Sequence, residues 1–225
     1  MKKFLTVFLV VGILGACSCN VKVGNGKIVV CKGAETLRVM DALTDFDAIV
    51  ANGAVDLDIR QADGCSVTVE ANSEVFDYLD FTVSNGKLVL DTKDHVNIKA
   101  DKYEIRICAP VLSSITFNGA VDGEMKNYTA DSSLDVVING AGDWEMKSIS
   151  VPSLTVSTNG AADLEIENLD TDTLSLEING AGDAVLSGRA DKAKFVVNGA
   201  GSIDARRLQI VTVETSKHGV ASIRL

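Results

Sequence analysis

A five-residue motif that begins with Asn-Gly returns about every twenty residues in this chain, and no other feature of the sequence constrains the fold as strongly. Aligned on their first residue, the later copies are separated by 21, 20, 20, 19 and 20 residues and begin at Asn118, Asn139, Asn159, Asn179, Asn198 and His218. An earlier copy begins at Asn52. A period of this regularity is typical of repeat proteins, in which each repeat is one structural unit stacked on its neighbours.

The residues around each motif alternate between apolar and polar. Leu134, Val136 and Ile138 precede the NGAGD copy at Asn139, and short segments such as DLEIE follow the glycine of other copies. Period two marks half-buried β-strands, and helical spacing is absent. The sequence therefore predicts an all-β fold.

Two all-β architectures fit this pattern. Asn-Gly between alternating strands favours a hairpin, because a type I′ turn needs positive φ twice, and this predicts an antiparallel β-prism or a meander of hairpins. In the alternative, a parallel β-helix or solenoid, each repeat is one coil with a contour of about 66 Å, and the coils stack about 4.8 Å apart. The sequence repeats the whole corner, Asn-Gly-Ala-small-Asp, and stacked corners require small residues and are stabilised by amide above amide. We therefore favour the solenoid.

The N-terminus resembles a bacterial lipoprotein signal. A basic n-region precedes an apolar run, Phe4–Leu14, that is too short to span a bilayer as a helix. The end of this run, Leu-Gly-Ala-Cys17, resembles a lipobox, which implies cleavage before Cys17 and lipidation of its thiol. An ordinary cleavage site beside a chance cysteine is the alternative. We expect residues 1–16 to be a signal peptide and the mature chain to be tethered by its lipid rather than inserted in the membrane.

Charge and cysteine content restrict the partners. The net charge of −10 makes the surface repel phosphate backbones, so we expect no nucleic-acid partner. Cys65 and Cys108 lie in strand-like alternation, and we expect buried free thiols, with a bridge between the two as the alternative. Sparse aromatic residues and abundant glycine suit a tightly wound β architecture.

Four segments together resemble the putative auto-transporter adhesin, head GIN domain family of secreted and lipid-anchored bacterial proteins. They are FDAIVANGAVDLDI (46–59), VSNGKLVLD (83–91), APVLSSITFNGAVD (109–122) and the serial NGAGD corners. The resemblance covers about residues 36–225 and implies a right-handed β-helix with no assigned activity and no catalytic residues. His218 in place of Asn departs from the pattern, as does the poorly repetitive stretch between Asn52 and Asn118, which puts a uniform coil count in doubt.

Three segments follow from these features. Residues 1–16 form the signal, 17–35 form a tether with few strand signals, and 36–225 form one GIN-like β-helix domain. The segment 36–50 is expected to hold the first strands and an N-terminal cap, because the end of a solenoid exposes unpaired backbone and apolar core.

A column of carboxylates is the candidate binding feature. The fourth residue after each motif asparagine is Asp56, Asp122, Asp143, Asp163 and Asp183, and then Ser202 and Ser222. Stacked coils would place these carboxylates about 5 Å apart. Calcium held by carboxylates and corner carbonyls is one interpretation. We favour the other, in which each Asp accepts hydrogen bonds from backbone N–H groups at its corner and no cofactor is bound.

Nothing in the sequence predicts catalysis. His95 and His218 match no triad or metal spacing, and Arg189, Arg206 and Arg207 show no convergence. A regular column does not provide two carboxylates in different environments, as a polysaccharide-degrading β-helix enzyme would need. Trp144 falls on the same side of its strand as Met146, which favours core packing over stacking on a sugar.

The resulting expectation is a lipid-anchored, extracytoplasmic protein of the cell envelope, on the outer membrane or the cell surface. Its stacked strand faces would act as a non-catalytic adhesion module for an extended ligand such as a glycan or an envelope protein. The first alternative is a structural envelope lipoprotein whose coil ends associate with each other. A polysaccharide-degrading enzyme is the second alternative.

Overall fold

The structure, a computed structural model, describes residues 22–23 and 26–225, which form an all-β fold with two short 3-10 helices. The N-terminal strands are β1 (Lys22–Val23), β2 (Gly26–Cys31), β3 (Glu35–Val39), β4 (Ala48–Gln61), β5 (Ser66–Asn72), β6 (Leu79–Ser84), β7 (Lys87–Thr92), β8 (Asn97–Ala100) and β9 (Tyr103–Ala109). The strands that carry the later repeats are β10 (Ser114–Thr129), β11 (Leu134–Gly180), β12 (Asp183–Gly199), β13 (Ser202–Gly219) and β14 (Ser222–Arg224). The helices are η1 (Ser73–Asp77) and η2 (Lys93–His95).

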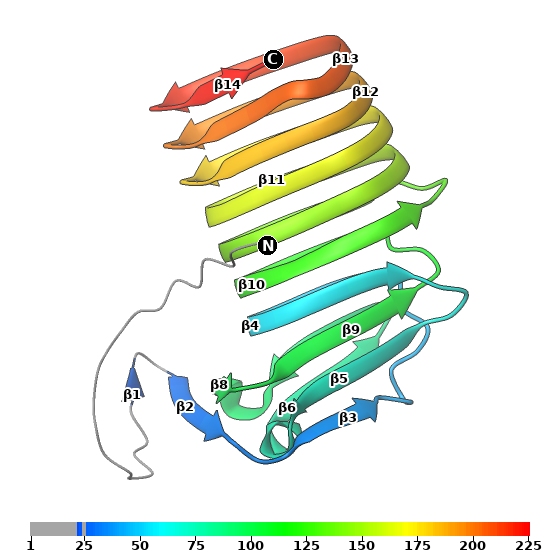
Figure 1. Cartoon of the computed structure of the whole chain (residues 1–225), viewed down its shortest axis with the longest axis vertical. Helices are drawn as coiled ribbons and strands as arrows, with labels where there is room; N and C mark the ends of the chain where they lie inside the picture. The colour runs from blue at the N-terminus through cyan, green and yellow to red at the C-terminus, as the bar shows by residue number, and fades with distance from the viewer. Residues whose placement is uncertain (1–21, 24–25) are drawn as a thin grey trace.

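Most strands belong to one open, mostly parallel sheet (Figure 1). Its order is β14-β13-β12-β11-β10-β4-β9-β5-β3, with the β6–β7 hairpin attached through β4. Along this order, every pair from β14 to β9 is parallel. The antiparallel pairs of this sheet are β5–β9, β3–β5 and β6–β7. A second sheet, β1-β2-β8, lies at the N-terminal end.

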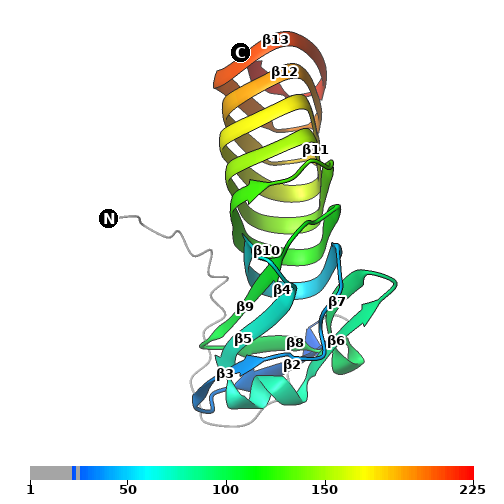
Figure 2. The ribbon, with the colours of Figure 1, turned by 90° about the vertical axis from the view of Figure 1, so that its right-hand side faces the viewer.

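Successive repeats lie on one another in register, parallel rather than antiparallel. Asn118 pairs with Asn52 on one side and with Asn139 on the other, and Asn198 pairs with Asn179. We call each repeat stacked in this way a layer; Figure 2 shows the layers above the N-terminal strands. A meander of hairpins at the repeated Asn-Gly corners is therefore wrong, because each corner stacks on the corner of the preceding layer.

One Asn-Gly pair does form the hairpin that its sequence favours. Asn85 and Gly86 connect β6 to β7, which pair antiparallel from Ser84↔Lys87 onwards. Their φ values, 52° and 73°, are the two positive values that a type I′ turn needs. The dipeptide alone thus permits both outcomes, and the pairing of the flanking strands decides between them.

Alternation along the strands builds a core that runs through all layers. Within one layer Leu134, Val136 and Ile138 are fully buried, and the next layers continue their positions with equally buried apolar residues. Among the matching inward positions between residues 154 and 197, Thr158 is the one polar residue. Because side chains alternate between the two faces of a strand, every second residue is left on the outside.

Most of the poorly repetitive stretch between Asn52 and Asn118 forms no further layers. Its residues 62–113, together with residues 26–47, form the cap at the N-terminal end. β4 pairs directly with β10 although 66 residues separate the two asparagines, and the intervening chain folds below β4 as β5 to β9. Gln61 joins the two sides of this insertion. Its Nε2 donates to the carbonyls of Pro110 (2.9 Å) and Thr129 (2.7 Å), and its Oε1 accepts from the Thr129 amide.

The folded part begins before residue 36. β2 lies inside the predicted tether 17–35, pairs in parallel with β8, and buries Cys31 in the core. Asn72, which is buried, links this segment to the cap by donating to the Gly33 carbonyl (2.7 Å) and accepting from the amides of Asp101 and Lys102. The tether was inferred from weak strand signals, and the pairing with β8 comes from a segment that is distant in sequence.

Cys31, Cys65 and Cys108 are free thiols. Cys108 pairs across β5 and β9 with Ser66, so Cys65, one residue away, points to the opposite face of the sheet, against the core. A bridge between Cys65 and Cys108 is incompatible with this arrangement. Cys17 lies outside the described residues, as do residues 1–16. Within the part that the structure describes, no helix has the length and apolar character needed to cross a membrane.

Candidate binding surfaces on the repeat layers

The motif asparagines form one continuous file of side-chain hydrogen bonds along the stack. In each layer the Nδ2 amide donates to the Oδ1 of the asparagine in the preceding layer, at 2.8–3.0 Å, and the pairs run from Asn118–Asn52 through Asn139, Asn159 and Asn179 to Asn198. Asn52 donates to Asp91 at one end, and the Nδ1 of His218 lies 3.1 Å from Oδ1 of Asn198 at the other. Each amide is thus both donor and acceptor, as in cross-β stacks.

In the layers above the first, the glycine of the motif is required by stacking and not by its positive φ alone. Gly140 has φ of 149°, and a Cβ added to it would overlap the carbonyl oxygen of Gly119 in the preceding layer. Gly160 and Gly180 stand in the same relation to the glycines below them. From Gly119 onwards, a side chain at this position would push two layers apart. Gly53, in the first layer, has open space around an added Cβ and only a positive φ of 90°.

The aspartates of the motif form a second file next to the asparagines. Oδ1 of Asp122 accepts from the Asp143 amide (3.0 Å), and Oδ1 of Asp163 accepts from the Asp183 amide (2.9 Å). Asp183 accepts from both the amide and the hydroxyl of Ser202. The N–H group that donates to each of these carboxylates therefore belongs to the next layer. The turn interpretation, in which the donor belongs to the same corner, is wrong for these aspartates.

Like charges in this file raise carboxyl pKa values. Asp143 is an exposed residue, but its carboxyl group is partly shielded from water. This desolvation is the first cause that raises its pKa, followed by the charges of Asp122, Asp163 and Glu145. The pKa of Asp56 is raised in the same way by burial, Asp122 and Glu104. No group of three or more His, Cys, Asp or Glu side chains in residues 26–225 is arranged to hold a metal ion.

A charged face lies on the outside of the sheet beside the aspartate file. Asp58, Glu124 and Glu145 align in successive layers, and Arg60, Lys126 and Lys147 align two residues further along. We call this surface, together with the aspartate file, the carboxylate face. Its cations pair along or across strands: Arg60 with Asp58 (2.9 Å), Arg106 with Asp58 (2.9 Å), Lys147 with Glu145 (2.7 Å) and Lys126 with Glu124.

These ion pairs leave the face with excess negative charge. Two arginines hold the pKa of Asp58 below its usual range through hydrogen bonds, despite the opposing effect of burial. Glu165, one layer beyond Glu145, has its pKa raised by burial first and then by Glu167 and Glu145. Because its strands pair in parallel and in register, the face repeats its side chains at the spacing of the layers.

A second file of corner residues has no shared residue type in the sequence. Asn127, Ser148 and Asn168 have φ of 52°, 57° and 55°, and Gly188 follows at 120°. Their steps of 21, 20 and 20 residues match the period of the first corner, and Asn168 Nδ2 donates to the Ser148 hydroxyl (3.2 Å). Spacing could have revealed this file, but the residue types change from layer to layer.

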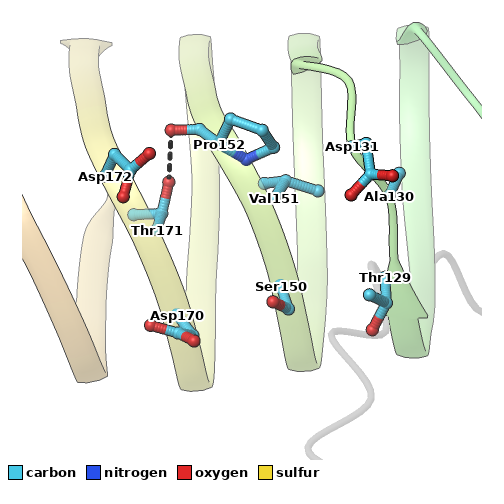
Figure 3. Close-up of a pocket in the computed structure, with 9 residues that line it drawn as sticks. All are labelled: Thr129, Ala130, Asp131, Ser150, Val151, Pro152, Asp170, Thr171 and Asp172. Atoms are coloured by element: carbon cyan, nitrogen blue, oxygen red, sulfur yellow. Dashed lines mark hydrogen bonds between the residues drawn. The ribbon is translucent and has the colours of Figure 1, made fainter.

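An open groove of about 210 Å³ lies near a further corner, where residues of three layers meet (Figure 3). Beside the groove, the Thr171 hydroxyl donates to the Pro152 carbonyl (3.2 Å) and so links two neighbouring layers. Its lining also carries three exposed carboxylates and comprises Thr129, Ala130, Asp131, Ser150, Val151, Pro152, Asp170, Thr171 and Asp172. The groove holds hydrogen-bonding groups but no aromatic side chain.

The histidine and arginine side chains considered as catalytic candidates do not come together in one site. His95 and His218 lie at opposite ends of the asparagine file, His95 beside Asp91 (3.4 Å) and His218 beside Asn198. Arg189 pairs with Asp191, and Arg206 with Asp204, whose pKa it lowers to about 2. Trp144 is 1% exposed and packs against Phe117, with ring centroids 4.8 Å apart, so it is a core residue and cannot stack on a sugar.

Comparison with solved structures shows the same fold in bacterial proteins. A crystal structure of a putative adhesin from Bacteroides fragilis covers 87% of this chain and 99% of its own, with a TM-score of 0.68 and 19% identity. A putative lipid binding protein (TM-score 0.54, 18% identity, 88% and 99% covered) and a putative adhesin (0.52, 15%, 87% and 99%), both from Parabacteroides distasonis, are also similar. No curated protein matches the chain.

The family model that matches the chain is described as the putative auto-transporter adhesin, head GIN domain, and it aligns with residues 45–225. This range includes every asparagine-started corner and all strands from β4 onwards. The resemblance inferred from the corners is thereby confirmed: the chain belongs to the putative auto-transporter adhesin, head GIN domain family.

Proposed function

We propose that the protein is a non-catalytic adhesion module of the bacterial cell envelope, built as a right-handed parallel β-helix and held at the membrane by a lipid on Cys17. The observation that carries the proposal is the in-register stacking of equivalent residues, Asn118 on Asn52 and Asn139 on Asn118, over successive layers. Such stacking makes a long surface with a repeated pattern, and a surface of this kind suits an extended ligand better than a small molecule.

The carboxylate face is the proposed contact surface. Its carboxylates in files at the layer spacing would accept hydrogen bonds from the hydroxyl groups of a glycan or from the amides and cations of an envelope protein. Membership of an adhesin family supports a surface location and a binding role. The scattered positions of His95, His218 and the arginines give no support to an enzyme.

A binding screen against immobilised glycans and envelope proteins tests this proposal. Glu165→Lys reverses one charge on the carboxylate face, and we expect it to weaken binding of any ligand that the unmodified chain selects. Asp135→Lys makes a comparable change on the outer side of the strand that precedes the Asn139 corner, away from that face, and serves as the control. Equal binding by both variants, or loss with the control alone, would exclude the carboxylate face as the contact surface.

Lipid anchoring is tested separately. The signal features of residues 1–16 support it, and Cys17→Ser should release the protein from membranes into the soluble fraction. Retention of the variant in washed membranes would contradict the anchor. This outcome is independent of ligand binding, because the carboxylate face lies in residues 56–183 and not in the tether.

A further inference from the structure

The two ends of the stack of layers are finished differently. The cap covers the N-terminal end, whereas residues 205–221 at the other end have no layer beyond them in the described chain. This terminal layer, which we define as residues 205–225, exposes three aliphatic side chains: Val211 (79%), Val220 (86%) and Leu225 (59%). Edge backbone groups and exposed aliphatic side chains together form a surface on which another strand can pair.

Two inward positions of the terminal layer carry polar residues where the preceding layer has apolar ones. Thr215 pairs with the buried Phe195, and Lys217 pairs with the buried Val197. A further apolar layer above Lys217 would bury its ammonium group, which is costly without a carboxylate partner. The end of the stack therefore favours a charged partner over another repeat of the same kind.

Charge differs in sign between the two ends of the molecule. The terminal layer has four cationic residues and one carboxylate residue, a net +3, although the whole chain carries −10. The cap, taken as residues 26–47 and 62–113, has thirteen Asp and Glu against eight Lys and Arg, a net −5. Opposite charge at the two ends attracts one end to the other and makes like ends repel.

The edge strand at the cap end has the direction that a continued sheet requires. β9 is parallel to β4, β5 is antiparallel to β9, and β3 is antiparallel to β5, so β3 runs parallel to all layers. β3 and β14 are the two outermost strands of the same sheet. β3 also exposes apolar side chains, Leu37 (60%) and Val39 (53%).

We propose that the terminal layer binds the β3 edge of a second copy of this chain, so that copies associate head to tail. The contact would continue the parallel pairing of the layers, set Val220 and Leu225 near Leu37 and Val39, and place the basic end on the acidic cap. Such a contact joins two different surfaces and does not close on itself, so it generates chains of copies rather than a symmetric pair.

The test uses two half-blocked variants of the full chain, purified in mild detergent. The head-blocked variant carries Leu37→Lys and Val39→Lys on β3, and the tail-blocked variant carries Val220→Glu and Arg224→Glu. Sedimentation velocity of the unmodified chain should show species that grow with concentration and shrink when NaCl is raised from 50 to 500 mM, because the attraction is electrostatic. Each variant alone should be monomeric. An equimolar mixture should form a 1:1 dimer and nothing larger, since each member keeps one intact end.

Three results would overturn the proposal. The first is an unmodified chain that stays monomeric at all concentrations. The second is a dimer formed by the head-blocked variant alone, which would show tail-to-tail pairing. The third is binding of the terminal layer to phosphatidylglycerol vesicles, lost in the tail-blocked variant, without self-association. Trp144 fluorescence confirms that each variant is folded. Ser132→Lys with Ser133→Lys, at exposed positions outside the cap and the terminal layer, controls for added surface charge. Arg206→Glu with Arg207→Glu replaces a tail-blocked variant that does not fold.

Discussion

Asn52 donates its Nδ2 hydrogen to Oδ2 of Asp91 at 2.9 Å, and this one hydrogen bond fixes the direction of the whole asparagine file. A carboxylate can only accept, so Asn52 must turn its NH₂ group towards the cap and its oxygen towards Asn118. The same orientation then passes from layer to layer and ends at Asn198, whose oxygen requires a donor from His218. All amides of the file point the same way, and the N–H end of their aligned dipoles faces the negative charge of Asp91.

Asn159→Asp should destabilise the protein more at pH 7 than Asn159→Ala does. The alanine removes two side-chain hydrogen bonds, to Asn139 (2.8 Å) and from Asn179 (3.0 Å), at a cost of about 1–2 kcal/mol. The aspartate variant loses the same hydrogen bond to Asn139 and, in addition, places a charged carboxylate oxygen against the Asn139 oxygen, which repels it. The folded state then favours the protonated acid, so the stability of the Asp variant should recover as the pH falls towards 4. Urea unfolding at both pH values measures this; an Asp variant no less stable than the Ala variant would contradict the common direction of the amides.

Three glycine-to-alanine variants separate stacking from backbone strain. Gly140→Ala combines positive φ with overlap of the Gly119 carbonyl, and we expect a loss of at least about 3 kcal/mol or failure to fold. Gly53→Ala has φ of 90° but open space around the added Cβ, so only about 1–2 kcal/mol should be lost. Gly64→Ala has neither feature and should be neutral or slightly stabilising. Thermal unfolding ranks the three; similar losses for Gly53 and Gly140 would mean that contact between layers is not limiting.

Asp143→Asn should stabilise the protein slightly at neutral pH. The substitution removes one charge from the aspartate file, and because Asp143 is exposed the gain should be no more than about 0.5 kcal/mol. The pKa of Asp143 is raised in the folded state, so its charge opposes folding above that pKa and the penalty disappears as the acid is protonated. The gain should therefore shrink as the pH falls towards about 4 and be absent below it. Asp172→Asn, at another corner, is the control, and a pH-independent gain would argue against charge repulsion.

The sole tryptophan should report the integrity of the core. Trp144 is buried with its indole N–H unpaired, and Gly123 lies beside its ring, where an added Cβ would be 2.9 Å from the ring atom Cζ3. We expect blue-shifted emission that iodide does not quench, with a red shift on unfolding. Gly123→Ala should lower the unfolding midpoint, because the ring and the Leu57 carbonyl both occupy the space needed. Quenching of the native emission would place Trp144 at the surface instead.

The repeat predicts the all-β fold and the parallel arrangement because the same residues return at the same spacing. Asn139 and Asn159 could be placed one above the other from the sequence, since only stacking explains why a whole corner is repeated. The aspartates could be placed in a file, but not the identity of the donors. The amide that binds Asp122 belongs to Asp143, and a corner considered alone offers nearer candidates.

A cap at the N-terminal end could be predicted, but not the segments that build it, because their contacts join stretches that share no pattern. The Gln61 side chain bonds the backbone of Pro110 and Thr129, and a single glutamine in a strand gives no sign of such a role. The pairing of β2 with β8 likewise joins residues about seventy positions apart. Short-range patterns indicate strands, whereas the partner of an unrepeated strand depends on the complete three-dimensional arrangement.

The contact of glycine on glycine between layers also bears on how such proteins lengthen during evolution. Because Gly140 rests on Gly119 and carries Gly160, a whole repeat can be duplicated or lost without redesign of its neighbours, whereas a partial one cannot. Length would then change in units of one repeat, about 4.8 Å at a time. Homologues of this protein would then differ in the length of the stack by whole repeats, while the cap and the terminal layer would be kept.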